Sequence, residues 1–99
     1  MVLRKLKQEA EIALRHLEVL EVVKENQPIG IFKLAEIMKI PKHKIRYSLR
    51  ILEQAGIIEP TQYGAIIRED SDKVFENLKK EIKEISEHIN KLNEIIQKL

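Results

Sequence analysis

The sequence predicts a mostly helical α+β chain, in which one small β-hairpin is set among helices. Apolar residues recur every three to four positions in four segments, which is the spacing of helices that bury one face. Two short runs rich in isoleucine, 57–59 and 65–68, flank a segment with Pro60 and Gly64, as in a hairpin. Proline or glycine also stands at most boundaries between these segments, where it ends one element and starts the next.

Residues 3–25 are expected to form a long first helix. An apolar stripe follows helical spacing along it, at Leu3, Leu6, Ala10, Ala13, Leu17 and Leu20. Asn26, Gln27 and Pro28 follow, and a proline just beyond a helix is a common stop signal. A short second helix is expected over residues 31–39, with four side chains available for burial: Phe32, Leu34, Ala35 and Met38.

Pro41 disfavours a helical conformation at Ile40, so a third helix is expected to start after it and to run over residues 42–55. Gly56 stands where a left-handed residue would end that helix. The hairpin is too small to be stable alone and must lean on the helices. A last helix is expected to reach Leu99, with an N-cap cluster formed by Asp70, Ser71 and Asp72.

The positive charge of the chain is concentrated in residues 39–50. The formal net charge is only +2, yet this stretch holds five basic side chains and no acidic one. The other segments are neutral or slightly negative. Ile45, Leu49 and Leu52 lie on one face of the expected third helix, so its opposite face is cationic. An amphipathic helix of this kind, after a tight turn, is suited to a groove of duplex DNA.

Residues 34–41 (LAEIMKIP) and 45–58 (IRYSLRILEQAGII) resemble the corresponding segments of small prokaryotic, especially archaeal, winged helix-turn-helix transcription regulators. The resemblance covers roughly residues 15–69. It implies a DNA-binding domain, which we place over residues 1–69 and which includes a helical extension at 1–14 outside the resemblance. It also implies that exposed early residues of the third helix contact DNA, and that the hairpin is the wing, with Gln62 and Tyr63 at its tip and Arg68 nearby.

In the expected third helix, the side chains that can point outward are Lys42, His43, Arg46, Tyr47 and Arg50. Arg46 is expected to contact a base, because its guanidinium can bond a guanine edge with two hydrogen bonds. Tyr47 could reach a phosphate or a thymine methyl group, and His43 either a base or a phosphate. The expected phosphate contacts are Lys42, Lys44 and Arg50. The alternative interpretation is that these charges only solvate an exposed face, and that Tyr63 is a turn residue that packs locally.

The last helix, in residues 70–99, is expected to dimerise the chain. Its apolar residues alternate gaps of three and four: Phe75, Leu78, Ile82, Ile85, Ile89, Leu92, Ile96 and Leu99. This spacing is typical of a coiled coil, and isoleucine at a positions with leucine at d favours two strands. The alternative is that the helix folds back on its own chain. A third arrangement combines the first and last helices of two chains in one interface.

Several function classes are disfavoured by the sequence. The chain has no cysteine, no apolar run long enough for a membrane span and no long apolar core of a signal peptide, so a cytoplasmic protein is expected. The three histidines have no metal-ligand spacing, and there is no glycine-rich phosphate loop. Ser48 and Ser71 lack an evident base and orienting acid. We therefore expect no enzyme, metal or cofactor, and no pattern indicates an effector.

The sequence thus predicts a homodimeric, sequence-specific transcription regulator that binds double-stranded DNA at a pseudo-palindromic site. The alternative function is a winged-helix module that binds another protein within a larger assembly, because one fold can serve either purpose.

Overall fold

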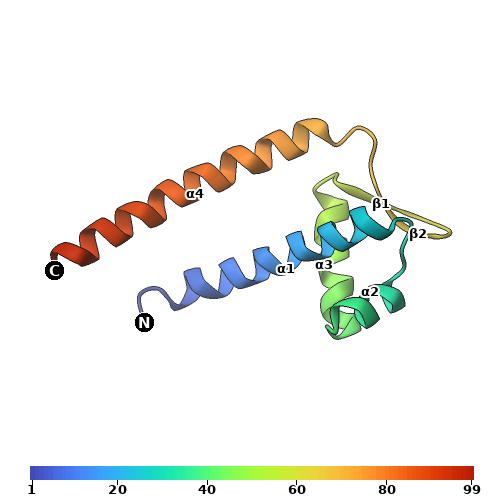
Figure 1. Cartoon of the computed structure of the whole chain (residues 1–99), viewed down its shortest axis with the longest axis horizontal. Helices are drawn as coiled ribbons and strands as arrows, with labels where there is room; N and C mark the ends of the chain where they lie inside the picture. Colours follow the sequence, from blue (N-terminus) through green and yellow to red (C-terminus); the bar gives the residue numbers. More distant parts are fainter.

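The computed structural model describes all 99 residues and has the expected order of elements (Figure 1). It is mostly helical with one two-stranded antiparallel sheet, which confirms the α+β class. The elements are α1 (Arg4–Asn26), α2 (Ile31–Met38), α3 (Lys42–Gln54), β1 (Ile58–Thr61), β2 (Gly64–Ile67) and α4 (Asp72–Lys98). No helix combines the length and the apolar character that a membrane crossing needs.

One hydrophobic core joins the second half of α1 to α2, α3 and the hairpin. The stripe on α1 supplies Val19, Leu20 and Val23, and the inward face of α3 supplies Ile45 and Leu52, as the apolar spacing predicts. The remaining buried apolar residues are Ile29, Leu34, Ile57, Ile58 and Ala65. Leu49 is only half buried and packs against this cluster.

The hairpin is held against the loop between α1 and α2. Ile29 forms an isolated bridge with Ala65, with N···O distances of 3.2 and 2.7 Å, and the Gln27 side-chain oxygen accepts a hydrogen bond from the Ile67 amide. At Gly64 φ is +126°, and a Cβ atom there would lie 2.6 Å from the Ile29 carbonyl oxygen. Glycine is therefore required where these two backbones approach, and the hairpin has a fixed position beside the helices.

The ends of three helices differ in how far they follow the prediction. Gly56 has φ +78° and ends α3 as expected. Ser71 is the N-cap residue of α4, within the expected cluster, but its hydroxyl donates to the Arg68 carbonyl oxygen (2.7 Å) and makes no side-chain cap bond. The expected burial of Phe32 is wrong. Its side chain is 69% exposed at the start of α2, since Leu34 and the half-buried Ile31, Ala35 and Met38 fill the space against the core.

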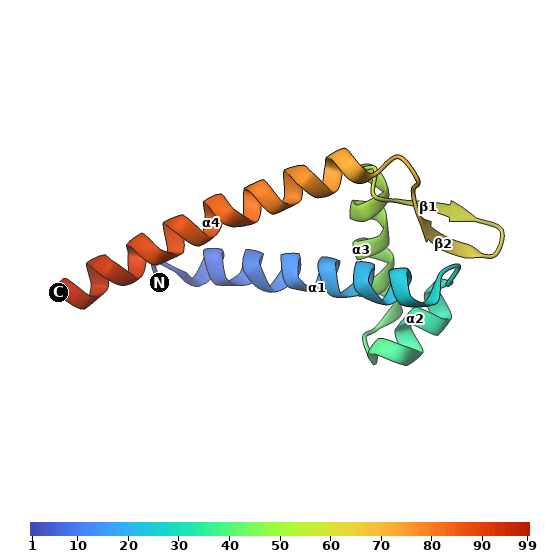
Figure 2. The same cartoon turned by 45° about the horizontal axis from the view of Figure 1, so that its top comes forward.

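Two helical arms extend from the compact part of the molecule (Figures 1 and 2). We call residues 1–14, which include the start of α1, and 79–99, which include the end of α4, the arms, and the remaining residues the body. Apart from half-buried Ile12, every arm residue is exposed. Only the start of α4 packs on the core, through Val74, Phe75 and Leu78. The radius of gyration is 15.9 Å, whereas a compact domain of this length has about 13 Å.

Candidate nucleic-acid interface

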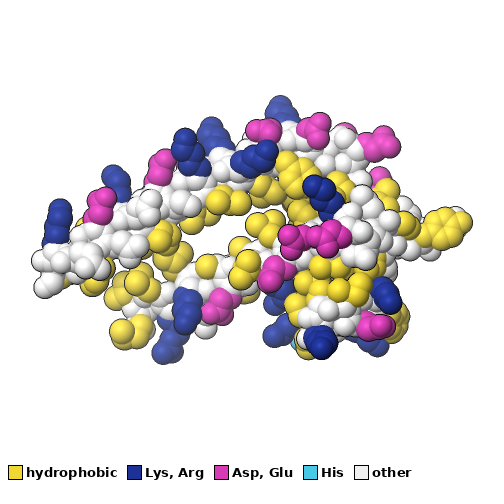
Figure 3. All heavy atoms as spheres, viewed as in Figure 1, with side chains coloured by type: hydrophobic (Ala, Val, Ile, Leu, Met, Phe, Trp, Pro, Cys, Tyr) yellow, Lys and Arg dark blue, Asp and Glu magenta, His cyan; other side chains and the backbone are white.

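The open face of α3 carries an exposed row of basic side chains. His43, Arg46 and Arg50 follow the spacing i, i+3, i+7 and so lie along one line of the helix, with Lys42 beside it at the N-terminal end. All four residues are exposed, and none is in an ion pair, since the ion pairs of the chain join other residues. Figure 3 shows Lys and Arg side chains around the end of the molecule that holds α2 and α3, and also along the outer side of α4.

Tyr47 and Lys44 lie on the side of α3 that faces α1. The Tyr47 ring centroid is 5.6 Å from that of His16, and the Arg15 guanidinium lies 6.0 Å from the Tyr47 ring. Tyr47 stays 45% exposed, so part of the residue remains open to solvent. Lys44 lines a hollow between α1 and the turn after α2, together with acidic side chains of α1. These two predicted residues therefore lie at the edge of the basic row.

A buried serine connects α1 to α3. Ser48 is fully buried, and its hydroxyl oxygen lies 2.8 Å from His16 Nδ1 and 3.1 Å from Arg15 Nε. The Arg15 Nε–H donates to this oxygen, which leaves the serine O–H free to donate to a neutral His16. No carboxylate is hydrogen-bonded to His16, and the serine oxygen is closed to solvent. The arrangement therefore fixes the rotation of α3 against α1 and is not a nucleophilic site.

The protonation of His16 is coupled to this contact. Burial of the imidazole, and next the charge of Arg15, lower the pKa of His16 below its ordinary value of 6.5. A protonated ring would stand beside the Arg15 guanidinium and could no longer accept a hydrogen bond from Ser48. The neutral ring is thus the form that the folded chain prefers.

An exposed aromatic ring stands beside the N-terminal end of the basic row. The Lys42 ammonium lies 4.1 Å from the centroid of the Phe32 ring, which is a cation–π distance. This contact holds the Lys42 side chain over α2 while leaving its charge exposed. The cationic surface therefore includes an apolar element that the charge pattern alone does not indicate.

The tip of the hairpin is exposed, but Arg68 does not belong to it. Gln62 and Tyr63 are exposed, and the turn is held by the Thr61 hydroxyl, which donates to the Gly64 carbonyl oxygen (2.7 Å). The expectation that Arg68 lies near the tip is wrong, because it follows the opposite end of β2. There it forms a two-bond pair with Asp70, at 2.9 and 3.0 Å.

The Arg68–Asp70 pair shifts both groups toward their charged forms. The hydrogen bonds and the charge of Asp70 raise the pKa of Arg68, and the same partner contacts lower the pKa of Asp70. Both side chains are open to solvent, so the contact is screened and of small energetic value. The ion pair nevertheless occupies the Arg68 guanidinium, whereas no such pair occupies the basic side chains of α3.

The eight apolar residues of α4 that were expected to dimerise the chain fall into two groups. Phe75 and Leu78 are half buried against the core. The other six are exposed along the arm: Ile82, Ile85, Ile89, Leu92, Ile96 and Leu99. Within the chain, α4 beyond Leu78 does not fold back onto α1 so as to bury this stripe.

Reasoning from the sequence missed the contacts that Arg15, His16, Ser48 and Phe32 make. One signal was present for Ser48, which comes three residues after Ile45 and four before Leu52 and therefore lies on the inward face of α3. A serine at such a position needs a hydrogen-bond partner from another helix. No comparable signal identifies Arg15 and His16 as that partner, because their direction depends on how α1 crosses α3.

Comparison with models of known protein families and with curated proteins finds no match to this chain.

Proposed function

We propose that the chain is a sequence-specific, DNA-binding transcription regulator of the winged helix-turn-helix type, which acts as a homodimer on a pseudo-palindromic duplex site. The observation that carries the proposal is the unpaired, exposed basic row on α3. A B-form major groove admits one α-helix, and phosphates line both of its edges. A helix that presents His43, Arg46 and Arg50 along one line, without a neighbouring acid in residues 39–50, matches both features.

The position of each side chain on α3 suggests its role. Arg46 lies in the middle of the row, so we assign it to a base edge, where its planar fork can make two hydrogen bonds. Lys42 and Arg50 lie at the two ends of the row and suit phosphates on either side of the groove. Tyr47 and Lys44, which face α1, are assigned to the edge of the contact, and Tyr63 and Gln62 at the hairpin tip to the backbone or minor groove.

Arginine substitutions test these roles directly. Arg46→Ala should weaken binding to a selected duplex by about 1–3 kcal/mol and relax the preference at one base pair. Arg50→Ala should weaken selected and random duplexes alike and reduce the salt dependence by about one unit of slope. Arg4→Ala, an exposed arginine at the far end of α1, is the matched control and should change neither. Fluorescence anisotropy over a range of salt concentrations measures all three.

The possible results distinguish an error in the roles assigned to Arg46 and Arg50 from an error in the proposed DNA-binding function. Equal and salt-insensitive effects of Arg46→Ala and Arg50→Ala would contradict the division between base and phosphate contacts. Failure of the unmodified chain to bind any duplex at low salt would contradict the DNA-binding function itself. In-vitro selection of bound duplexes adds the site, in which two-fold symmetry with half-sites about 34 Å apart is expected for a dimer.

A second candidate function is a winged-helix module that docks on an acidic protein. The observation that favours it is Phe32, whose ring is 69% exposed beside Lys42. Aromatic side chains are enriched at protein interfaces, and the Lys42 ammonium beside the ring would complement an acidic partner. Salt-dependent binding of random duplex by the unmodified chain, lost in the α3 variants, would favour DNA over this candidate.

A further inference from the structure

The two arms present apolar stripes toward one another and leave them uncovered. Leu3 and Leu6 in the first arm are 53% and 43% exposed, and Leu17, where α1 enters the body, is 37% exposed. On α4 the facing stripe starts at Phe75 in the body and continues through Ile82 and Ile89 in the arm. Figure 3 shows apolar side chains on the facing sides of the two arms, with an opening between them. Basic and acidic side chains of α4 gather on its other side in the same view.

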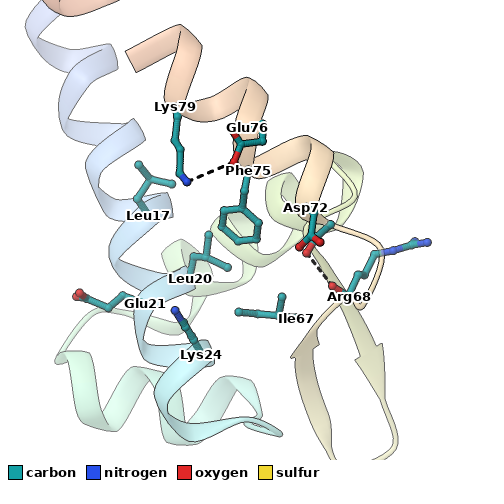
Figure 4. A pocket seen from close by; sticks show the side chains of 11 residues that line it. Leu17, Leu20, Glu21, Lys24, Ile67, Arg68, Asp72, Phe75, Glu76 and Lys79 are labelled. Atoms are coloured by element: carbon teal, nitrogen blue, oxygen red, sulfur yellow. Dashed lines mark hydrogen bonds and ion pairs between the residues drawn. The ribbon is translucent and has the colours of Figure 1, made fainter. Parts of the chain in front are cut away.

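The groove between the arms begins at a hollow in the body. This cavity, of about 740 Å³, lies between α1, the segment before α4 and the first turns of α4. Leu17, Leu20, Ile67 and Phe75 form its apolar floor (Figure 4). Charged residues stand around it, and two of them, Lys79 and Glu76, pair with each other at 3.4 Å. The apolar surface is therefore continuous from the core to the tips of the arms.

The chain exposes more surface than a compact monomer of its mass, and the excess has the size of a dimer interface. The accessible surface is 7931 Å² for a mass of 11.6 kDa. A compact monomer of that mass exposes ~5,800 Å² by the usual scaling of surface with mass, so the excess is ~2,100 Å². Obligate homodimers bury about 1,000–2,500 Å² on each partner. The excess is thus too large for a small ligand to cover and is sufficient for a second copy.

We propose that the groove between the arms is filled by α4 of a second copy, so that α1 and α4 of each chain form the dimer interface together. A helical occupant fits, because the α4 stripe repeats at the 3.5-residue spacing that knobs-into-holes packing needs. A two-fold axis makes the contact reciprocal, since each α4 then lies in the groove of the other chain. The inference rests on the homodimer in the proposed function and not on DNA binding.

The proposal gives the first arm a role that a coiled coil of α4 alone would not. In the two-stranded coiled coil, Leu3 and Leu6 would remain in water. In the proposed arrangement they are buried by the partner's helix. Because the second half of α1 belongs to the core and its middle is bonded to Ser48, the dimer would also fix the distance between the two α3 helices.

One matched pair of variants on α1 tests this. Leu6→Glu adds a charge on the stripe, whereas Gln8→Glu adds the same charge on the opposite face, where Gln8 borders the hollow beside Lys44. Ile89→Glu tests the α4 stripe. Sedimentation equilibrium without DNA should show a dimer for the unmodified chain. The dimer dissociation constant should rise about 100-fold or more for Leu6→Glu and Ile89→Glu, and it should stay nearly unchanged for Gln8→Glu.

Each other outcome overturns the proposal. A monomer at every concentration excludes a second copy as the occupant, and a trimer or tetramer excludes the two-fold arrangement. If Leu6→Glu associates as tightly as Gln8→Glu while Ile89→Glu dissociates, the interface is formed by α4 alone. Leu6 and Ile89 lie outside the core, so the circular dichroism of all variants should match that of the parent chain. Because no DNA is present, failure of DNA binding would leave these results unchanged.

Discussion

The body and the arms use the same kinds of apolar residues in opposite ways. In the body, leucine, isoleucine and valine from four elements and their connecting loops meet in one cluster, and most are less than a tenth exposed. In the arms, the same residue types at the same helical spacing stay exposed. Helical periodicity therefore identifies which face of a helix is apolar, but not whether that face is covered within the chain. The body completes its own packing, whereas the apolar faces of the arms stay uncovered within the chain.

The largest expected difference between the two regions concerns the removal of a leucine side chain. Leu34→Ala creates a cavity in the core and should lower the free energy of unfolding by about 2–5 kcal/mol. Leu92→Ala removes the same atoms from the arm, where the residue is 40% exposed. Urea unfolding at concentrations where the chain is monomeric should show a change within about 0.5 kcal/mol for it. Equal losses would mean that the arms are packed within one chain.

A backbone contact gives the next largest effect. Gly64→Ala should destabilise the body by about 1–3 kcal/mol, because φ is +126° and the new Cβ would clash with the Ile29 backbone. Gly30→Ala is the control, since a Cβ at Gly30 meets no atom within 4 Å and its φ of −94° is open to any residue. Urea unfolding measures both. If Gly64→Ala were as stable as Gly30→Ala, the hairpin could not be held against the loop as described.

The smallest expected effect is a pH dependence that belongs to the body alone. Since the pKa of His16 is lowered in the folded chain, the unfolded chain binds more protons below its ordinary pKa of 6.5. The stabilisation that comes from the neutral His16 ring is fully present above pH 6.5 and is lost as the pH falls through the lower pKa of His16 in the folded chain.

The urea midpoint of the unmodified chain, measured between neutral and mildly acidic pH, should therefore fall more steeply than that of His16→Gln. Glutamine keeps a polar group near Ser48 and removes the titration. Identical pH profiles for the two chains would show that His16 does not change its protonation on folding.

The sequence predicted the order and approximate bounds of all six elements, because each depends on local spacing and on the residues at its ends. It also predicted the inward ladder of Ile45 and Leu52 and the left-handed conformation of Gly56. The contacts between elements could be predicted less well. The burial of Phe32 and the place of Arg68 were wrong, and Ser71 stands at the N-cap of α4 without a cap bond, since each depends on a competing contact that spacing does not specify.

The candidate site shows the same division. The exposed basic row on α3 follows from helical spacing once the apolar face is identified. The positions of Tyr47 and Lys44 beside α1 do not, because they depend on the direction from which α1 approaches. Ile29 likewise pairs with β2 through an isolated bridge. Such a bridge involves one residue and leaves no pattern in the sequence.

Helix α1 has 23 residues without a proline or glycine, and it belongs to both regions. It is therefore a lever of roughly 34 Å at 1.5 Å per residue, with no hinge along its length. Its free end lies in an arm, and its other end is embedded beside α3. A small tilt at the free end would turn α3 by the same angle, since no flexible linker exists to absorb the motion. Changes in how Leu3 and Leu6 pack should thus be felt at Arg46, although the two sites share no contact.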